Sequence, residues 1–307
     1  MKLQDITNAL SEYMPPVLRW AGAIARQLQR FDVRVRGKKT SGSATTDALT
    51  LADLSVQELL VAALRDGDPI FRQCRLEAEE SAGDLQRFAA AGTYTIAIDP
   101  IDGTKRYQEG SKDGWCVTFN LRSVETVHYS LVYIPGSGAN GRWVEVVDDR
   151  IVCGDDDLSR PAGEVLHALA AIDPTTRPDT KNIYLSGFQQ DDMAKVRLLN
   201  AWGLTGYTPD NLPGCIFELF ARGTFAGTLV HTPNVYDFPV TLHMARILGG
   251  DAQWVQNGEA VDFRGLWVDD RADMLRMPGI IACSANRETL AALCDLAKNW
   301  DPLRYRA

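Results

Sequence analysis

The chain has 307 residues, of which 45% are hydrophobic and 23% are charged, which is usual for a globular protein with a buried core. Its formal net charge of −8 argues against binding to nucleic acid polymers or to anionic membranes, because both are themselves negatively charged. No stretch approaches the length of a transmembrane helix, and Met1–Arg26 lacks the continuous apolar run of a signal peptide. The six cysteines are scattered without a Cys-x-x-Cys pair, which predicts free thiols and a cytoplasmic location.

The N-terminal segment is predicted to be helical. A short helix begins near Leu3, and we expect Pro15-Pro16 to interrupt it and to open a second helix with an apolar stripe from Val17 to Leu28. Residues 37–46 are small, polar and basic, a composition that fits a surface linker and a lid over an active site equally well.

A further helix is predicted from Thr50 to Leu64. Asp53 stands just inside its start, where the helix dipole favours a carboxylate, and a lone aspartate at this place is most often a cap. An acidic cluster, Glu79-Glu80-Ser81, follows a predicted strand and is compatible with an ordinary solvated helix start.

The most informative stretch of the chain runs from Ile96 to Thr104. A buried strand beginning at Tyr94 is expected to end at Asp99, where Pro100 forces a turn that brings Asp102 close to the first carboxylate. The alternative interpretation is an ordinary strand followed by an Asp-Pro turn.

The next two residues suit the binding of an anion. Gly103 lets a ligand approach the main chain, and Thr104 stands where a helix could begin with free N–H groups. Together with the two preceding carboxylates they predict a site where hard cations and a phosphate meet.

The remaining predicted elements follow a different order in the two halves of the chain. In the first half, helices are followed by strands expected to be largely antiparallel, which is typical of an α+β protein; the strands are Trp115–Leu121, Thr126–Ile134, Arg142–Val147 and Arg150–Cys153. In the second half strands and helices mix: strands at Asn182–Leu185, Thr228–Val230, Ala252–Val255 and Ile280–Cys283, and helices at Asp191–Trp202, Phe238–Leu248 and Asn286–Trp300. We therefore predict an N-terminal domain over residues 1–160 and a C-terminal domain over residues 161–307.

The stretch Asp99–Thr104 resembles the Asp-Pro-Ile/Leu-Asp-Gly-Thr signature of the inositol monophosphatase family, a group that includes bisphosphate nucleotidases. Thr50–Asp53 is similar to the family's Thr-x-x-Asp, and Glu79-Glu80-Ser81 to its Glu-Glu-Ser. Tyr236-Asp237 stands where the second signature has Trp-Asp. The resemblance extends over nearly the whole chain, and it implies a layered αβαβα sandwich of mixed α+β and α/β character.

The resemblance also implies a Mg²⁺-dependent, Li⁺-sensitive phosphomonoesterase with two or three ions. It assigns the first ion to Glu79, Asp99 and the carbonyl of Ile101, and the second to Asp99, Asp102 and Asp237; Glu79 also reaches a weaker third ion. These oxygen donors are the kind that Mg²⁺ prefers.

The resemblance assigns the catalytic roles in the same way. Thr104, hydrogen-bonded to Asp53 or Glu79, would orient the attacking water, and the N–H groups of Gly103 and Thr104 would hold the phosphate. The C-terminal domain would contribute Asp237 and the substrate pocket.

Departures from the family pattern bear on the substrate, a small phosphorylated metabolite. Inositol phosphatases usually have Thr-Asn-Phe after Gly-Thr, whereas Lys105-Arg106-Tyr107 here resembles the branch that acts on nucleotide 3′-phosphates. Val230 stands about where inositol phosphatases have a sugar-contacting glutamate, and it cannot accept hydrogen bonds from a polyol. These residues favour a nucleotide 3′-phosphate or a sugar phosphate, with Lys105 binding the substrate, unless Lys105 and Arg106 are simply solvated.

Three other substrates of the family remain open: inositol phosphate, histidinol phosphate and fructose bisphosphate. A different class of function, a catalytically silent phosphate-binding regulatory protein, is disfavoured because no expected ligand is missing and Thr104 is present. The oligomeric state, including a homodimer, and the number of bound ions are left open by the sequence.

Overall fold

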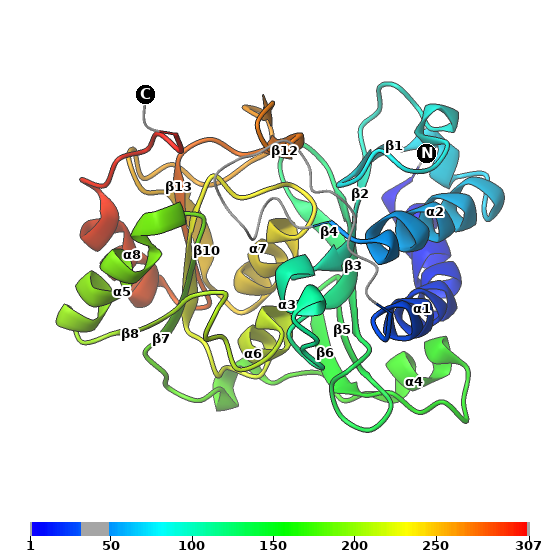
Figure 1. The fold of residues 1–307 in the computed structure, drawn as a ribbon, viewed down its shortest axis with the longest axis horizontal. Coiled ribbons are helices and arrows are strands. Elements are labelled where there is room, and N and C mark those ends of the chain that lie inside the picture. The colour runs from blue at the N-terminus through cyan, green and yellow to red at the C-terminus, as the bar shows by residue number, and fades with distance from the viewer. Residues whose placement is uncertain (1, 32–48, 306–307) are drawn as a thin grey trace.

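The computed structural model describes residues 2–31 and 49–305, and it shows helices and sheets arranged in layers (Figure 1). The predicted loop at residues 37–46 lies outside the described residues. In the part of the chain that is described, no helix is long and apolar enough to cross a membrane.

The outermost layer on one side consists of α1 (Leu3–Leu28) and α2 (Leu51–Asp66). The predicted break at Pro15-Pro16 is wrong, because α1 continues through both prolines. Buried residues continue on both sides of the pair, from Leu10 and Met14 to Leu18, so packing against the rest of the fold offsets the backbone hydrogen bonds that proline removes. The helix predicted from Thr50 is confirmed, and Thr50 caps it by accepting hydrogen bonds from the N–H groups of Ala52 and Asp53.

Six strands form the first sheet, and their order in the sheet is their order in the chain. The pair β1–β2 is parallel and the other neighbours are antiparallel, as expected of the first half. The strands are β1 (Arg75–Ala78), β2 (Thr95–Asp102), β3 (Cys116–Arg122), β4 (Val127–Ile134), β5 (Arg142–Val147) and β6 (Arg150–Asp155). The short helices α3 (Thr104–Gln108) and α4 (Ala162–Ala168) lie beside them in the chain.

The second sheet has five strands in the order β10-β13-β9-β7-β8, and a two-stranded hairpin, β11–β12, stands apart from it. Its strands and the hairpin are β7 (Asn182–Ser186), β8 (Thr205–Tyr207), β9 (Gly227–His231), β10 (Asp251–Trp254), β11 (Trp267–Asp269), β12 (Met274–Arg276) and β13 (Ile280–Ser284). The helices are α5 (Asp192–Ala201), α6 (Ile216–Ala221), α7 (Phe238–Ile247) and α8 (Arg287–Ala297). The sequence did not predict α4, α6, β8 or the hairpin, each of which is too short for a clear periodic pattern.

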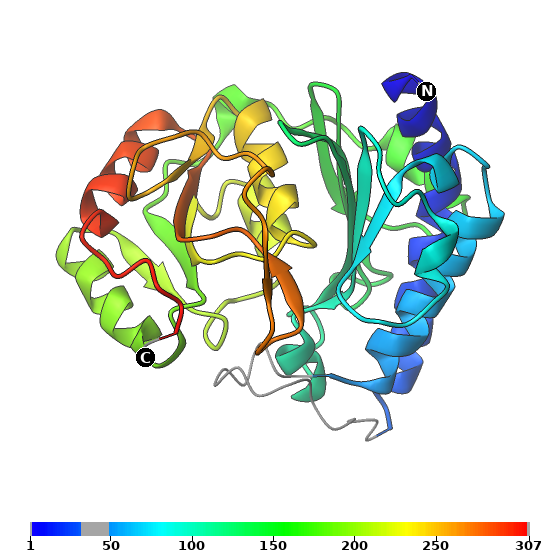
Figure 2. The same ribbon diagram turned by 90° about the horizontal axis from the view of Figure 1, so that it is seen from above.

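Figure 2 shows the layers edge-on: α1 and α2, the six-stranded sheet, α6 and α7, the five-stranded sheet, and then α5 and α8. Three apolar clusters fill the spaces between them, one under α1 and α2, one around α6 and α7, and one under α8. The predicted αβαβα sandwich is thereby confirmed, while the division near residue 160 stays a prediction.

The strand β2 departs from the prediction at its end. It does not stop at Asp99 but continues to Asp102, with a shift of register against β3 between these two residues. Such a bulge accommodates Pro100, which has no N–H to offer a neighbouring strand. The bulge places both aspartates on ordered, paired backbone rather than in a free turn.

We predict that the contact of α1 with the first sheet depends on Gly22. A Cβ atom at this buried position would lie 2.5 Å from Pro135 Cγ and 2.7 Å from Tyr133 Cδ1. Gly22→Ala should therefore lower the free energy of unfolding by about 1–3 kcal/mol, although alanine is the better helix former. The matched control is Gly163→Ala in α4, where a Cβ would meet nothing within 4 Å; urea denaturation of both variants is the measurement, and equal stabilities would contradict the prediction.

Candidate metal and phosphate site

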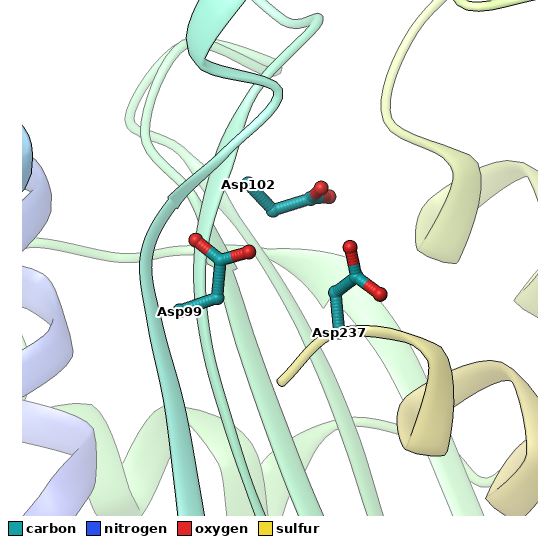
Figure 3. Close-up of side chains that lie close together, drawn as sticks. All are labelled: Asp99, Asp102 and Asp237. Atoms are coloured by element: carbon teal, nitrogen blue, oxygen red, sulfur yellow. The ribbon is translucent and has the colours of Figure 1, made fainter. Parts of the chain in front are cut away.

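Three carboxylates from distant parts of the chain converge between the two sheets. Asp99 and Asp102 lie on β2, and Asp237 directly precedes α7. One oxygen of each lies within 4.8 Å of the others, and Figure 3 shows the three side chains pointing toward one another. The structure therefore places Asp237 next to Asp99 and Asp102, as predicted.

Glu79 adjoins this cluster because of the parallel pairing of β1 with β2. It follows the last residue of β1, and its N–H donates to the carbonyl of Ile98 at 3.2 Å, so it stands beside Asp99. Glu79 also lines the same pocket as the three aspartates. Its negative charge raises the pKa of each of them.

Burial and mutual repulsion make the ionised aspartates unfavourable. Burial, followed by the charges of Glu79, Asp102 and Asp237, raises the pKa of Asp99 well above its usual value. The pKa of Asp237 is raised in the same way, by burial first and then by Asp102 and Glu79. Burial raises the pKa of Asp102 to about 6, although the Cys116 thiol, which donates to its Oδ2 at 3.5 Å, opposes the shift. Cations bound here would relieve both effects.

Asp237 occupies the predicted N-cap position of α7, but its side chain does not cap the helix. Its Oδ2 instead accepts a hydrogen bond from Asn234 Nδ2 at 3.0 Å, while Asn234 Oδ1 accepts from the N–H groups of Tyr236 and Asp237. Asn120 on β3 donates to the carbonyl of Tyr236 at 2.9 Å. The two asparagines fix the turn that presents Asp237 to the cluster, and no pattern in the sequence indicated either.

Asp53 has two roles, as a cap and in the candidate site. Its Oδ2 accepts hydrogen bonds from the N–H and Oγ1 of Thr50 at 2.7 and 2.6 Å. Its Oδ1 lies 3.1 Å from Thr104 Oγ1, which also lies 2.9 Å from the carbonyl of Ile101. Thr104 thus lies against two of the residues that the sequence assigned to the site.

Gly103 has a backbone conformation that other residues rarely adopt. Its φ is +87°, and a Cβ here would lie 2.6 Å from the carbonyl oxygen of Gly114. This turn separates Asp102 from Thr104, so the carboxylate stays on β2 while the hydroxyl starts α3. Gly103 and Thr104 both line the pocket.

Lys105 and Arg106 have protein partners rather than being simply solvated. Lys105 forms an ion pair with Asp210, and its Nζ lies 4.0 Å from Glu109. Arg106 Nη1 donates to the carbonyl of Pro209 at 2.9 Å and to that of Leu212 at 3.3 Å. The two cations therefore join α3 to the loop before α6.

The donor set suits a hard divalent cation. Carboxylate oxygens, with the carbonyl of Ile101 beside them, are the ligands that Mg²⁺ and Ca²⁺ prefer. The carboxylates are buried and repel one another, so a bound cation would lower their electrostatic free energy. A core of neutral side chains would offer a cation no such gain.

Comparisons with known proteins agree with the sequence signatures. Residues 16–161 match the model of the inositol monophosphatase family. This part of the chain, a little under half of its length, is therefore similar to that family. None of the curated proteins with which the sequence was compared matches it.

Several solved structures share the fold of the chain. The extragenic suppressor protein suhB from Bartonella henselae is 15% identical, with a TM-score of 0.65 over 95% of this chain and 100% of that one. CysQ from Bacteroides thetaiotaomicron is 16% identical, with a TM-score of 0.61 over 92% and 98% of the two chains. An IMPase/NADP phosphatase solved with Mg²⁺ and phosphate is 16% identical, with a TM-score of 0.62 over 97% of each chain.

We predict that Asp99→Asn abolishes metal binding without harming the fold. Asparagine keeps an oxygen that can accept the hydrogen bond that Asp99 Oδ1 takes from the N–H of Ile101 at 3.0 Å, and it removes one repelling charge. Metal-dependent turnover should fall by more than about 100-fold, because even changes outside the ligand set typically cost 10–100-fold. The melting temperature without metal should be no lower than that of the parent. Asp149→Asn, at an exposed acid, is the control, and parent-like turnover in Asp99→Asn would contradict the assignment.

The raised pKa values also predict how the metal-free protein responds to pH. A carboxyl group whose pKa is higher in the folded than in the unfolded state stabilises the fold when protonated, and this contribution is lost as the pH rises through the folded pKa. Burial raises the pKa of Asp53, like that of Asp102, to about 6, and it raises the pKa of Asp99 well above its usual value. In EDTA the protein should melt at a lower temperature at about pH 7 than at about pH 5, and Asp99→Asn should reduce the difference. An equal or larger difference in Asp99→Asn would contradict the prediction.

Proposed function

We propose that the protein is a Mg²⁺-dependent phosphomonoesterase that hydrolyses a small phosphorylated metabolite. The observation that carries the proposal is the convergence of Asp99, Asp102 and Asp237 beside the hydrogen-bonded pair of Asp53 and Thr104. The three carboxylates provide hard ligands for a cation, and the pair provides the hydroxyl of Thr104 next to these ligands.

In the proposed mechanism two or three Mg²⁺ ions would be held by Glu79, Asp99, Asp102, Asp237 and the carbonyl of Ile101. The ions, when bound, would neutralise phosphate charge and lower the pKa of water. An IMPase/NADP phosphatase of the same fold has been solved with Mg²⁺ and phosphate, which supports this ligand class.

The protein's own groups would position the reactants. Thr104 Oγ1 is held by Asp53 Oδ1 and the carbonyl of Ile101. It would accept a hydrogen bond from the attacking water and so orient that water. Glu79, which directly follows the neighbouring strand β1, would help to position the same water. The N–H groups of Gly103 and Thr104 at the start of α3 would hold the phosphate oxygens in line with that water.

For the substrate we propose a nucleotide 3′-phosphate or a sugar phosphate. Val230 on β9 lines the pocket together with Leu212, Phe217 and Met274, and these side chains suit the face of a base or ribose better than a ring of hydroxyls. Inositol, histidinol and fructose-bisphosphate substrates are the alternatives within the family, and a silent phosphate-binding protein is the alternative outside catalysis.

Hydrolysis is predicted to require Mg²⁺ and to be inhibited by Ca²⁺. Ca²⁺ is larger and accepts irregular coordination, so it should occupy the carboxylates without aligning water and phosphate. Release of inorganic phosphate should stop in EDTA and return with Mg²⁺; inhibition by Li⁺ follows from the family resemblance. Full turnover in excess EDTA would refute the mechanism.

A panel of phosphorylated metabolites tests the substrate. We expect a nucleotide 3′-phosphate to be hydrolysed with a higher kcat/KM than inositol 1-phosphate, because Val230 offers no hydrogen bond to a polyol. Side-by-side kinetics at one Mg²⁺ concentration decide this point. A clear preference for inositol 1-phosphate would contradict the assignment, and release of phosphate from no compound would favour the silent binding protein.

A further inference from the structure

The segment that leads to Asp237 begins at a residue with an unusual backbone. Thr232 directly follows β9, is 2% exposed and has a φ of +47°. A β-branched residue rarely adopts this left-handed conformation, and Pro233 favours an extended backbone at the residue before it. The other non-glycine residues with positive φ in the described part of the chain carry no β-branch: Asp148, Gln189 and Asp273. The backbone of Thr232 is therefore strained.

Each polar group of Thr232 has a partner that holds this conformation. Its N–H donates to the carbonyl of Gly279 at 2.7 Å, and its carbonyl accepts from Arg276 Nη1 at 3.0 Å. Its hydroxyl donates to the carbonyl of His231 and accepts from Arg304 Nη1, both at 2.8 Å. Strained backbone persists where the surrounding contacts over-determine it, and these four contacts do so.

The two arginines that hold Thr232 are themselves anchored. Asp269, the last residue of β11, is 1% exposed. Its Oδ2 accepts a hydrogen bond from Arg276 Nε at 2.8 Å and lies 3.5 Å from Arg304 Nε. Both ribbon views show the end of the chain (red) and the β11–β12 hairpin (orange) on the same side of the molecule (Figures 1 and 2). The end of the chain therefore reaches the turn after β9.

The conformation of Thr232 is linked to the position of Asp237. The backbone of Asn234 pairs with that of Arg276 on β12, and Asn234 Nδ2 donates to Asp237 Oδ2 at 3.0 Å. The dihedral angles of Thr232 set the direction in which this segment leaves β9. If Thr232 took up the extended conformation that threonine favours before proline, the segment would leave β12 and Asp237 would move away from the cluster.

We propose that Arg304 is a positioning residue for the metal site, because it holds Thr232 in the left-handed conformation and so keeps Asp237 in the carboxylate cluster. The proposal rests on the proposed metal-dependent function and adds the C-terminal end of the chain to the residues that this function needs. Glycine adopts a positive φ without steric cost. Arg304 should therefore matter for metal binding only while a residue with a side chain stands at position 232.

The experiment is a double-mutant cycle in which isothermal titration calorimetry measures the binding of Mg²⁺ alone. Arg304→Gln should weaken Mg²⁺ binding about tenfold, as the loss of a residue that supports metal ligands typically does. In the background of Thr232→Gly, the same substitution should weaken binding by less than about twofold, because the two changes act on one contact.

A second pair of variants tests the proposal without changing Arg304. Thr232→Val and Thr232→Gly both remove the hydroxyl that Arg304 contacts, but valine is as stiff as threonine and glycine is not. Thr232→Val should therefore bind Mg²⁺ about tenfold more weakly than Thr232→Gly does. This comparison decides the question even if Arg304→Gln does not fold.

Two further variants are matched controls. Arg271→Gln removes an exposed arginine whose guanidinium lies 4.4 Å from the ring centroid of Tyr305, and it should leave Mg²⁺ binding unchanged. Asp148→Gly relieves a positive φ of +53° at an exposed residue between β5 and β6. Combined with Arg304→Gln, it should not restore Mg²⁺ binding, because it lies far from Thr232 in the fold.

Thermal melting in EDTA distinguishes positioning from general stabilisation. A lower Tm in Arg304→Gln with parent-like Mg²⁺ affinity would overturn the proposal, since Arg304 would then only stabilise the fold. The same holds for an equal loss of affinity in the Thr232 and Thr232→Gly backgrounds, or for equal affinities of Thr232→Val and Thr232→Gly. If the affinities follow the expected pattern but no phosphomonoester is hydrolysed, the phosphatase function fails and the role of Arg304 stands.

Discussion

The structure depends on holding like charges together in a place shielded from water. Asp99, Asp102 and Asp237 would repel one another less if they were further apart, and burial removes the water that would screen them. The surrounding fold keeps them together: the bulge in β2 presents two of them, and the Asn234 turn presents the third. Keeping these carboxylates together therefore lowers the stability of the fold unless cations bind to them.

The two halves of the molecule contribute different parts of this site. The N-terminal half supplies a fixed set of oxygens and the Asp53–Thr104 pair, which suit the phosphate common to all substrates. The C-terminal half supplies Asp237 and residues of β9, the hairpin and the loop held by Arg106, which line the rest of the pocket. Because most of the pocket wall lies on other segments than β2, side chains of the wall can vary while Asp99 and Asp102 stay in place.

The sequence could predict that Asp99 and Asp102 lie close together because they are neighbours in the chain, where proline, glycine and strand patterns are readable. Asp237 could be assigned only through the resemblance to a family, since no local rule joins it to β2. Asn234 and Asn120 were missed because single polar residues in turns or strands are common, and Asn120 has its partner, the carbonyl of Tyr236, far away in the sequence. The errors at Pro15-Pro16 and at the end of β2 have one cause: a local rule for proline was overridden by packing and by a bulge.

The position of Asp237 has a consequence for synthesis on the ribosome. All six strands of the first sheet are translated before Asp237 emerges, so the growing chain carries Asp99 and Asp102 without their third partner. A chain that ends before Asp237 would contain all six strands of the first sheet, yet it would lack one carboxylate of the cluster. The cluster is therefore complete only after most of the chain, including β7 to β9 of the second sheet, has been synthesised.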